Sequence, residues 1–114
     1  MRRVELPEEP LTHFDSDGVR LRPLVRALEP VDGFAVDVVA VAAGGRLGRH
    51  HTRLWQLYAV VSGEGWVSGA DGRPEPIRAG EAVLWEPGEE HGSGSDGGMV
   101  ACVVQSPVDL RRAR

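Results

Sequence analysis

The stretch "GGRLGRHHTRLWQLYAVVSGEG", Gly44–Gly65, decides the fold and contains two of the four histidines of the chain. From Leu54 to Gly63 it reads as an extended strand, with apolar residues on both alternating faces. A strand with two apolar faces avoids bulk water on both sides. One face therefore lines a core, and we expect the other to contact a second sheet or a second subunit.

The composition is typical of one small domain built from short strands. Fifteen glycines and eight prolines among 114 residues favour strands joined by tight turns. Val-rich runs at 33–45 and 97–105 predict two further strands. Asp71-Gly72 is predicted to form a two-residue hairpin turn, and Pro87-Gly88 a second turn. Because no periodic helix of useful length is found, the sequence predicts an all-β sandwich or barrel.

Charge and cysteine content exclude several classes of protein. The net charge of -4, from 17 acidic and 13 basic residues, argues against a nucleic-acid surface. The chain has no apolar run long enough for a transmembrane helix, and its first 18 residues lack the apolar core of a signal peptide. Cys102 is the single cysteine, so it has no intramolecular disulfide partner. We expect a cytoplasmic protein without nucleic-acid or membrane partners.

Two spaced patterns of glycine and histidine occur in order along the chain. The first runs Gly44, five residues, His50, five residues, Gln56, six residues, Gly63. The second runs Gly80, five residues, Glu86-Pro87-Gly88, two residues, His91.

In order and spacing, these patterns resemble the two motifs of the small single-domain cupins (cupin type 2, RmlC-like), over roughly residues 34–105. The resemblance implies a double-stranded β-helix, an antiparallel jelly-roll barrel. We expect an N-terminal arm at 1–18, the barrel at 19–108 and a C-terminal tail at 109–114. The resemblance and the apolar outer face of the strand at 54–63 both favour a homodimer.

The resemblance also implies a site for one divalent metal inside the barrel. The family uses two histidines and a glutamate from the first motif and one histidine from the second. At these positions the chain has His50, Thr52, Gln56 and His91, so two of the four ligands are unchanged. Zn, Fe, Mn or Ni is the expected ion, held by the two histidines and Gln56.

Strand geometry leaves two registers open for the histidine pair. Residues at i, i+2 and i+6 of a strand share a face, which places His50, Thr52 and Gln56 together. A β-bulge would instead turn His51 inward. Gln56 brings no charge to offset a dication, so the affinity is expected to be lower than in a complete site. The alternative interpretation makes His50 and His91 hydrogen-bonded groups in a solvated cavity.

Aromatic and acidic residues near these motifs are further candidates. Trp66 and Trp85 could stack on a ligand at the mouth of the barrel, or simply fill the core. Tyr58 shares the face of Gln56 and could donate a hydrogen bond or a proton. Glu90, beside His91, could move protons or stay a solvated loop residue. Trp55 lies on the opposite face and is expected at a subunit interface.

These observations support two functional hypotheses. The first is a protein that binds a small molecule in the barrel, with or without the metal, through Thr52, Tyr58, Trp66 and Trp85. The second is a metal-dependent enzyme of the dioxygenase or isomerase type acting on a small polar or aromatic substrate. A purely structural dimer is disfavoured by the polar residues that face inward.

Overall fold

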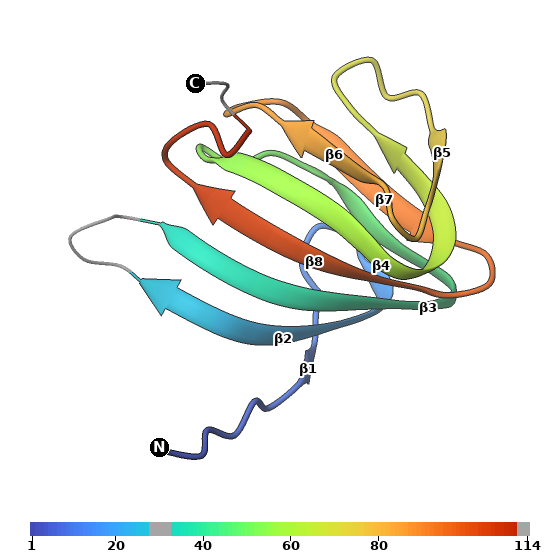
Figure 1. Ribbon diagram of the computed structural model, residues 1–114. Coiled ribbons are helices and arrows are strands. Elements are labelled where there is room, and N and C mark those ends of the chain that lie inside the picture. The colour runs from blue at the N-terminus through green and yellow to red at the C-terminus, as the bar shows by residue number, and fades with distance from the viewer. Residues whose placement is uncertain (28–32, 112–114) are drawn as a thin grey trace.

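The computed structural model describes residues 1–27 and 33–111, and within them it is built from strands and turns alone (Figure 1). No helix able to cross a membrane is found among these residues. The strands are β1 (Glu9–Pro10), β2 (Asp17–Ala27), β3 (Phe34–His50), β4 (Trp55–Ser68), β5 (Glu75–Arg78), β6 (Ala82–Trp85), β7 (His91–Ser95) and β8 (Met99–Ser106).

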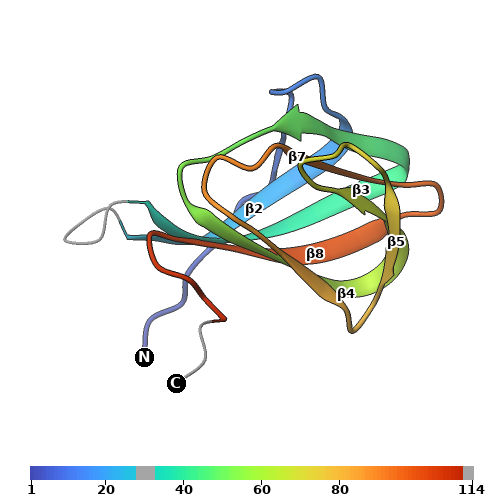
Figure 2. The same cartoon turned by 90° about the horizontal axis from the view of Figure 1, so that it is seen from above.

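The strands form two antiparallel groups, called ladders below, which close into a barrel, as the view from above shows (Figure 2). One ladder has the order β1-β2-β3-β8-β4-β6. The other has the order β3-β7-β4-β5. The long strands β3 and β4, with 17 and 14 residues, take part in both. The predicted antiparallel jelly-roll barrel is confirmed.

Two glycines mark the points where the long strands pass from one ladder to the other. In β3, pairing with β8 ends at Val41 and pairing with β7 begins at Gly45. Gly44 lies between them with φ of 78°. In β4 the corresponding corner is Gly63, whose φ is 77°. Left-handed backbone favours glycine, so these corners explain why both glycines appear in the first motif.

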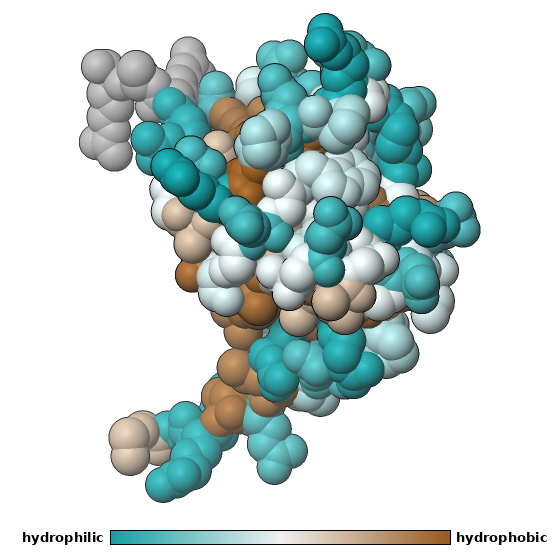
Figure 3. Space-filling view, turned by 90° about the vertical axis from the view of Figure 1, so that its right-hand side faces the viewer, coloured by the Kyte–Doolittle hydropathy of each residue, from teal (hydrophilic) through white to brown (hydrophobic). Residues whose placement is uncertain are grey.

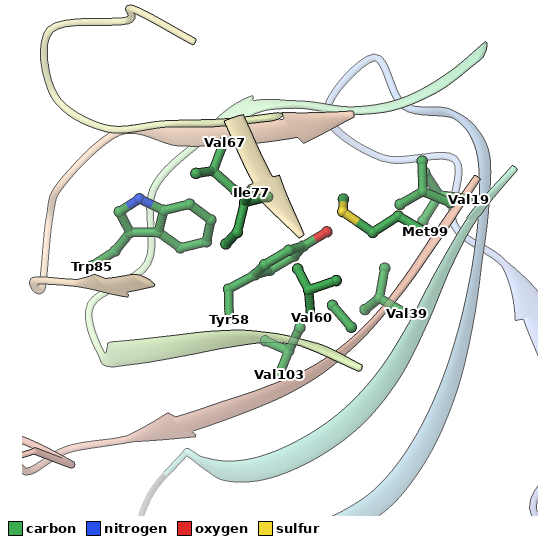
Figure 4. Close-up of a cluster of buried hydrophobic side chains, with 11 residues drawn as sticks. Val19, Val39, Tyr58, Val60, Val67, Ile77, Trp85, Met99 and Val103 are labelled. Atoms are coloured by element: carbon green, nitrogen blue, oxygen red, sulfur yellow. The ribbon is translucent and has the colours of Figure 1, made fainter. Parts of the chain in front are cut away.

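The core lies between the two ladders and follows the alternation of the strands. In β4, Gln56, Tyr58 and Val60 are buried, and the residues between them are partly exposed. Figure 4 shows Tyr58 at the centre of the cluster, with Trp85 beside it and Met99 toward the other end. The inward face thus becomes polar toward the end that holds Gln56 and His91.

The turn between β4 and β5 differs from the prediction. Six residues separate Ser68 from Glu75, so the connection is longer than the predicted two-residue turn at Asp71-Gly72. The backbone NH of Gly72 donates to the Gly69 carbonyl at 2.9 Å, which centres the turn on Ala70 and Asp71. Two prolines follow: Pro74 lies just before β5, and Pro76 lies within β5, in register with Trp66 of β4. The predicted Pro87-Gly88 turn is present, closed by a 3.0 Å bond from Glu89 NH to the Glu86 carbonyl.

The N-terminal segment is divided between an exposed end and a part that packs on the barrel. Residues 1–7 are exposed and extend away from the barrel (Figure 1). Strand β1 pairs with β2, and the loop at 11–16 then turns back over the barrel end. The face in Figure 3 is mainly hydrophilic, with hydrophobic residues gathered where this segment leaves the barrel. Of the predicted C-terminal tail, residues 112–114 lie outside the described residues.

We predict that Gly65→Ala destabilises the barrel by about 1–3 kcal/mol, because an added methyl group would overpack the close contact between the paired strands β4 and β7. A Cβ on Gly65 would lie 2.1 Å from the carbonyl oxygen of Gly94 in β7. Gly97→Ala is the matched control, since a Cβ there meets no atom within 4 Å. Urea unfolding of both variants measures the difference. Equal unfolding midpoints for the two variants would contradict this account of the contact between β4 and β7.

Candidate functional site

A cavity of about 190 Å³ opens at the polar end of the barrel. Strands of both ladders and the loop at 11–16 contribute its walls, so the site exists only when the barrel is closed. The lining residues are Leu11, Phe14, Leu21, Asp37, Val39, Leu47, His50, Gln56, Tyr58, Trp85, His91, Gly92, Ser93, Val103 and Gln105. A cavity of this size accommodates a molecule of about one ring, as a 150 Å³ apolar cavity accommodates benzene.

Two histidines face each other across neighbouring strands of this cavity. His50 of β3 is paired with His91 of β7, and their ring centroids are 4.5 Å apart at an interplanar angle of 64°. The β3–β7 register shifts between Leu47 and His50, which marks an irregularity in the ladder. Such irregularities re-aim side chains. Here His50 lines the cavity, and the neighbouring His51 is exposed.

Backbone hydrogen bonds select the tautomer of both imidazoles. Nδ1 of His50 lies 2.7 Å from the Gly48 carbonyl oxygen, and Nδ1 of His91 lies 2.9 Å from that of Glu89. A carbonyl only accepts, so each Nδ1 carries the proton and each Nε2 keeps its lone pair. Nε2 of His91 is buried and has no hydrogen-bond partner among the described residues.

Aromatic rings bracket the histidine pair. Phe14 stacks on His50 and Trp85 stacks on His91, each with centroids 4.1 Å apart and planes within 10° of parallel. Tyr58 contacts Trp85 at a centroid distance of 5.4 Å. These contacts fix the planes of both imidazoles and enclose them in a mostly apolar wall.

Burial keeps the two imidazoles and the phenol of the site uncharged near neutral pH. It lowers the pKa of His91 to about 4, and it also lowers the pKa of His50. Burial raises the pKa of Tyr58, an effect that the Ser93 hydroxyl partly offsets. The cavity therefore presents two neutral imidazole acceptors and a neutral phenol.

The donor set fits a metal ion that accepts imidazole nitrogen. His50 and His91 each bind a backbone carbonyl through Nδ1, the arrangement that orients histidines whose Nε2 ligates a metal. Gln56 lines the same cavity with an amide oxygen available as a third donor. These three donors carry no negative charge, since imidazole and amide groups are neutral. The described residues contain no group of three or more His, Cys, Asp or Glu that could hold a metal ion.

Of the other predicted site residues, some line the cavity and some do not. Tyr58 and Trp85 line it, and both are almost fully buried. Thr52 does not, because its hydroxyl accepts from the NH of Leu54 at 2.8 Å. Trp66 lines a separate open groove formed by β4, β5 and the β7–β8 turn. Glu90 is exposed and forms an ion pair with Arg49 at 3.2 Å.

The cavity also contains residues that the sequence analysis missed. Asp37 and Gln105 interrupt apolar strands at inward-facing positions, two residues from the inward-facing Val39 and Val103. Strand parity was thus a usable signal for both. Phe14 gave no such signal, since it lies in a polar segment outside any predicted strand.

Comparisons with known proteins agree with this architecture. A family model described as "Cupin domain" matches residues 37–105. A predicted oxalate decarboxylase from Thermotoga maritima has 21% identity and a TM-score of 0.80, with 91% of this chain and 95% of that chain covered. The polyketide cyclase RemF from Streptomyces resistomycificus has 22% identity and a TM-score of 0.78, with 100% and 88% covered. No match was found among curated proteins.

We predict that the metal-free protein loses stability as the pH falls from about 7 to about 4. Below pH 6.5 the unfolded chain protonates His91, and the folded chain does so only near its pKa of about 4. The free energy of unfolding therefore decreases by about 3 kcal/mol through this window and levels off below it. Urea unfolding at several pH values, with a chelator present, measures the slope.

Two glutamine variants isolate the contribution of His91 to this pH dependence. The glutamine of His91→Gln cannot be protonated in the unfolded chain, so this variant should lose the part of the slope that His91 causes and keep that of His50. His51→Gln changes an exposed histidine next to the site and should keep the slope. A full pH dependence in His91→Gln would show that other groups cause it.

Proposed function

The chain belongs to the cupin family, and we propose that it binds a small molecule inside the barrel, with His50 and His91 as the polar anchor of the site. The observation that carries this proposal is the buried Nε2 of His91, which has no partner among the described residues. Leaving a buried acceptor unpaired costs about 1–3 kcal/mol. An occupant that donates a hydrogen bond to this nitrogen, or a metal ion that accepts its lone pair, recovers that cost.

A divalent metal is the proposed link between the protein and the molecule it binds. His50, Gln56 and His91 would hold Zn, Fe, Mn or Ni, and a bound ion would supply a Lewis acid at the cavity. The exposed His51 is not part of this proposed set. Trp85 holds the plane of His91, and Glu89 holds its tautomer through the backbone carbonyl. These contacts prepare the imidazole before an ion arrives.

A metal-dependent enzyme, of the dioxygenase or isomerase type, is the alternative. The observation that favours it is the Tyr58 hydroxyl, a neutral proton donor in the wall of the same cavity. Trp85 adds a flat surface for a small polar or aromatic substrate. Glu90 is not included in this proposal, because it forms an ion pair with Arg49 at the surface.

A second copy of the chain is the proposed macromolecular partner. The outward side chains of one ladder are apolar and partly exposed, and a contiguous apolar face of this kind is typical of an interaction surface. Because the same face meets itself across a two-fold axis, no second complementary surface is needed. This face is formed by Val36, Val38, Ala40, Trp55, Leu57, Ala59, Leu84, Val100, Cys102 and Val104.

Charged residues border this apolar face along β2. Arg20 and Arg22 pair with Glu8 at 2.6 and 3.2 Å, which offsets part of their positive charge at the edge of the face. A standard interface buries about 800 Å² on each partner.

A nucleic-acid partner is not proposed, given the net charge of -4. The cytoplasmic location stays a prediction from the N-terminal composition and the single cysteine.

We predict that His50→Ala and His91→Ala each weaken metal binding at least about tenfold, since both remove a direct ligand. His51→Ala is the matched control and should bind as the unmodified chain does. Elemental analysis of untagged protein and titration with Zn²⁺, Ni²⁺, Mn²⁺ and Fe²⁺ measure the effect. Failure of every ion to bind would remove the metal from the proposal. Equal binding in all three variants would place the metal elsewhere.

We predict that Val104→Asp converts a dimer into a folded monomer, because it buries an unpaired charge at the centre of the apolar face. Ala79→Asp adds the same charge to an exposed turn and should leave the dimer intact. Light scattering gives the mass, and circular dichroism shows whether each variant is folded. An unmodified chain that is monomeric at high concentration would contradict the homodimer.

A further inference from the structure

The loop at 11–16, between β1 and β2, lies over the cavity. Leu11 and Phe14 of this loop are part of the cavity wall. The ring of Phe14 stacks on His50 at 4.1 Å, although 50% of this residue is exposed. One side of the ring therefore covers a site residue and the rest meets solvent.

Few contacts hold the tip of the loop, residues 14–16, and they go to the last residues of β3. The start of the loop is anchored separately, because the NH of Leu11 donates to the Val19 carbonyl at 2.9 Å and its side chain packs on the core. The Ser16 hydroxyl accepts from the NH of Gly48 at 3.2 Å. Asp15 pairs with Arg46 at 2.8 Å, but both side chains are at least half exposed. An exposed ion pair of this kind contributes little. The tip is thus docked by weak, separable interactions, in contrast to the continuous ladders of the barrel.

The tip adopts a backbone conformation that docking must maintain. Phe14 has φ of 61° and Asp15 has φ of 55°, and they are the non-glycine residues with positive φ in the described part of the chain. This region is unfavourable for a residue with a side chain, above all a bulky one. Such residues persist where surrounding contacts over-determine them, and they concentrate in clamps and switch regions. The docked loop therefore stores strain that undocking releases.

Gly48 provides the surface on which the loop docks. A Cβ at position 48 would lie 1.7 Å from the carbonyl oxygen of Phe14, and the next atoms it would meet also belong to the loop. The backbone of Gly48 is not in the left-handed region, so alanine suits its local conformation. Its lack of a side chain is needed for the loop and not for the strand.

We propose that residues 11–16 form a lid that closes the cavity, with Phe14 as the residue that covers His50 and Gly48 as the position that allows closure. Opening would expose the walls of the cavity, and closure would shield the Nε2 atom of His91 from water. The occupant of the closed state is the small molecule of the proposed function, and to that extent this inference depends on it. The motion itself does not, so it is tested in the empty protein.

The test compares Gly48→Ala with Gly97→Ala in a chain where Trp55 and Trp66 are replaced by Phe. Trp85 is then the only tryptophan, and it is buried in the cavity wall, 4% exposed. Acrylamide, a small neutral quencher, reports how often solvent reaches it. We expect Gly48→Ala to raise the quenching constant several-fold and to speed hydrogen exchange in residues 11–18. Gly97→Ala should change neither quantity.

A second variant, Phe14→Ala, keeps the backbone of β3 unchanged and removes only the covering ring. It should raise the quenching of Trp85 as well, and it carries the test if Gly48→Ala does not fold. Unchanged quenching in both variants would overturn the lid. So would faster exchange at 11–18 without greater quenching, because the loop would then open without exposing the cavity. These measurements use neither metal nor ligand, so their failure is distinct from a failure of metal binding.

Discussion

The structure depends on two long strands that belong to both ladders of the barrel. β3 and β4 each turn a corner at a glycine with positive φ, Gly44 and Gly63. Without these corners the ladders would be two open sheets with unpaired edges. With them, the C-terminal end of β3 meets β7, and residues of these two strands form the cavity together with Gln56 and Tyr58 of β4. The glycines of the first motif are therefore structural, and they position the site indirectly.

The chemical character of the cavity follows from how its imidazoles are held. Each Nδ1 is committed to a backbone carbonyl, and burial disfavours the protonated ring. The histidines consequently offer lone pairs and no positive charge. A site of this kind suits a ligand that brings its own positive charge or donors, such as a metal ion or a hydroxyl group. The stacked rings of Phe14 and Trp85 keep these lone pairs in place without adding competing polar atoms.

Parts of the site follow directly from strand parity, and parts do not. Gln56 and Tyr58 face inward because β4 is regular there, as the alternation predicts. By its spacing in the sequence, Thr52 would share the inward face with Gln56 and Tyr58. It lies instead in the turn before β4, where its hydroxyl accepts a hydrogen bond from the NH of Leu54. Trp66 lies beyond the corner at Gly63, so it lines a different groove. Parity holds only within one uninterrupted strand, since a turn or a corner resets which face is inward.

The sequence by itself determined the all-β class, the order of the two motifs and the inward face of the strand that contains Gln56 and Tyr58. Each of these depends on residues close together in the chain, where spacing alone decides the geometry. Only the tertiary structure decided that His50 and not His51 enters the cavity, since that follows from a register shift against β7. It also decided that Phe14 covers the site. That contact joins segments 36 residues apart, and local spacing contains no information about which distant segments will pack together.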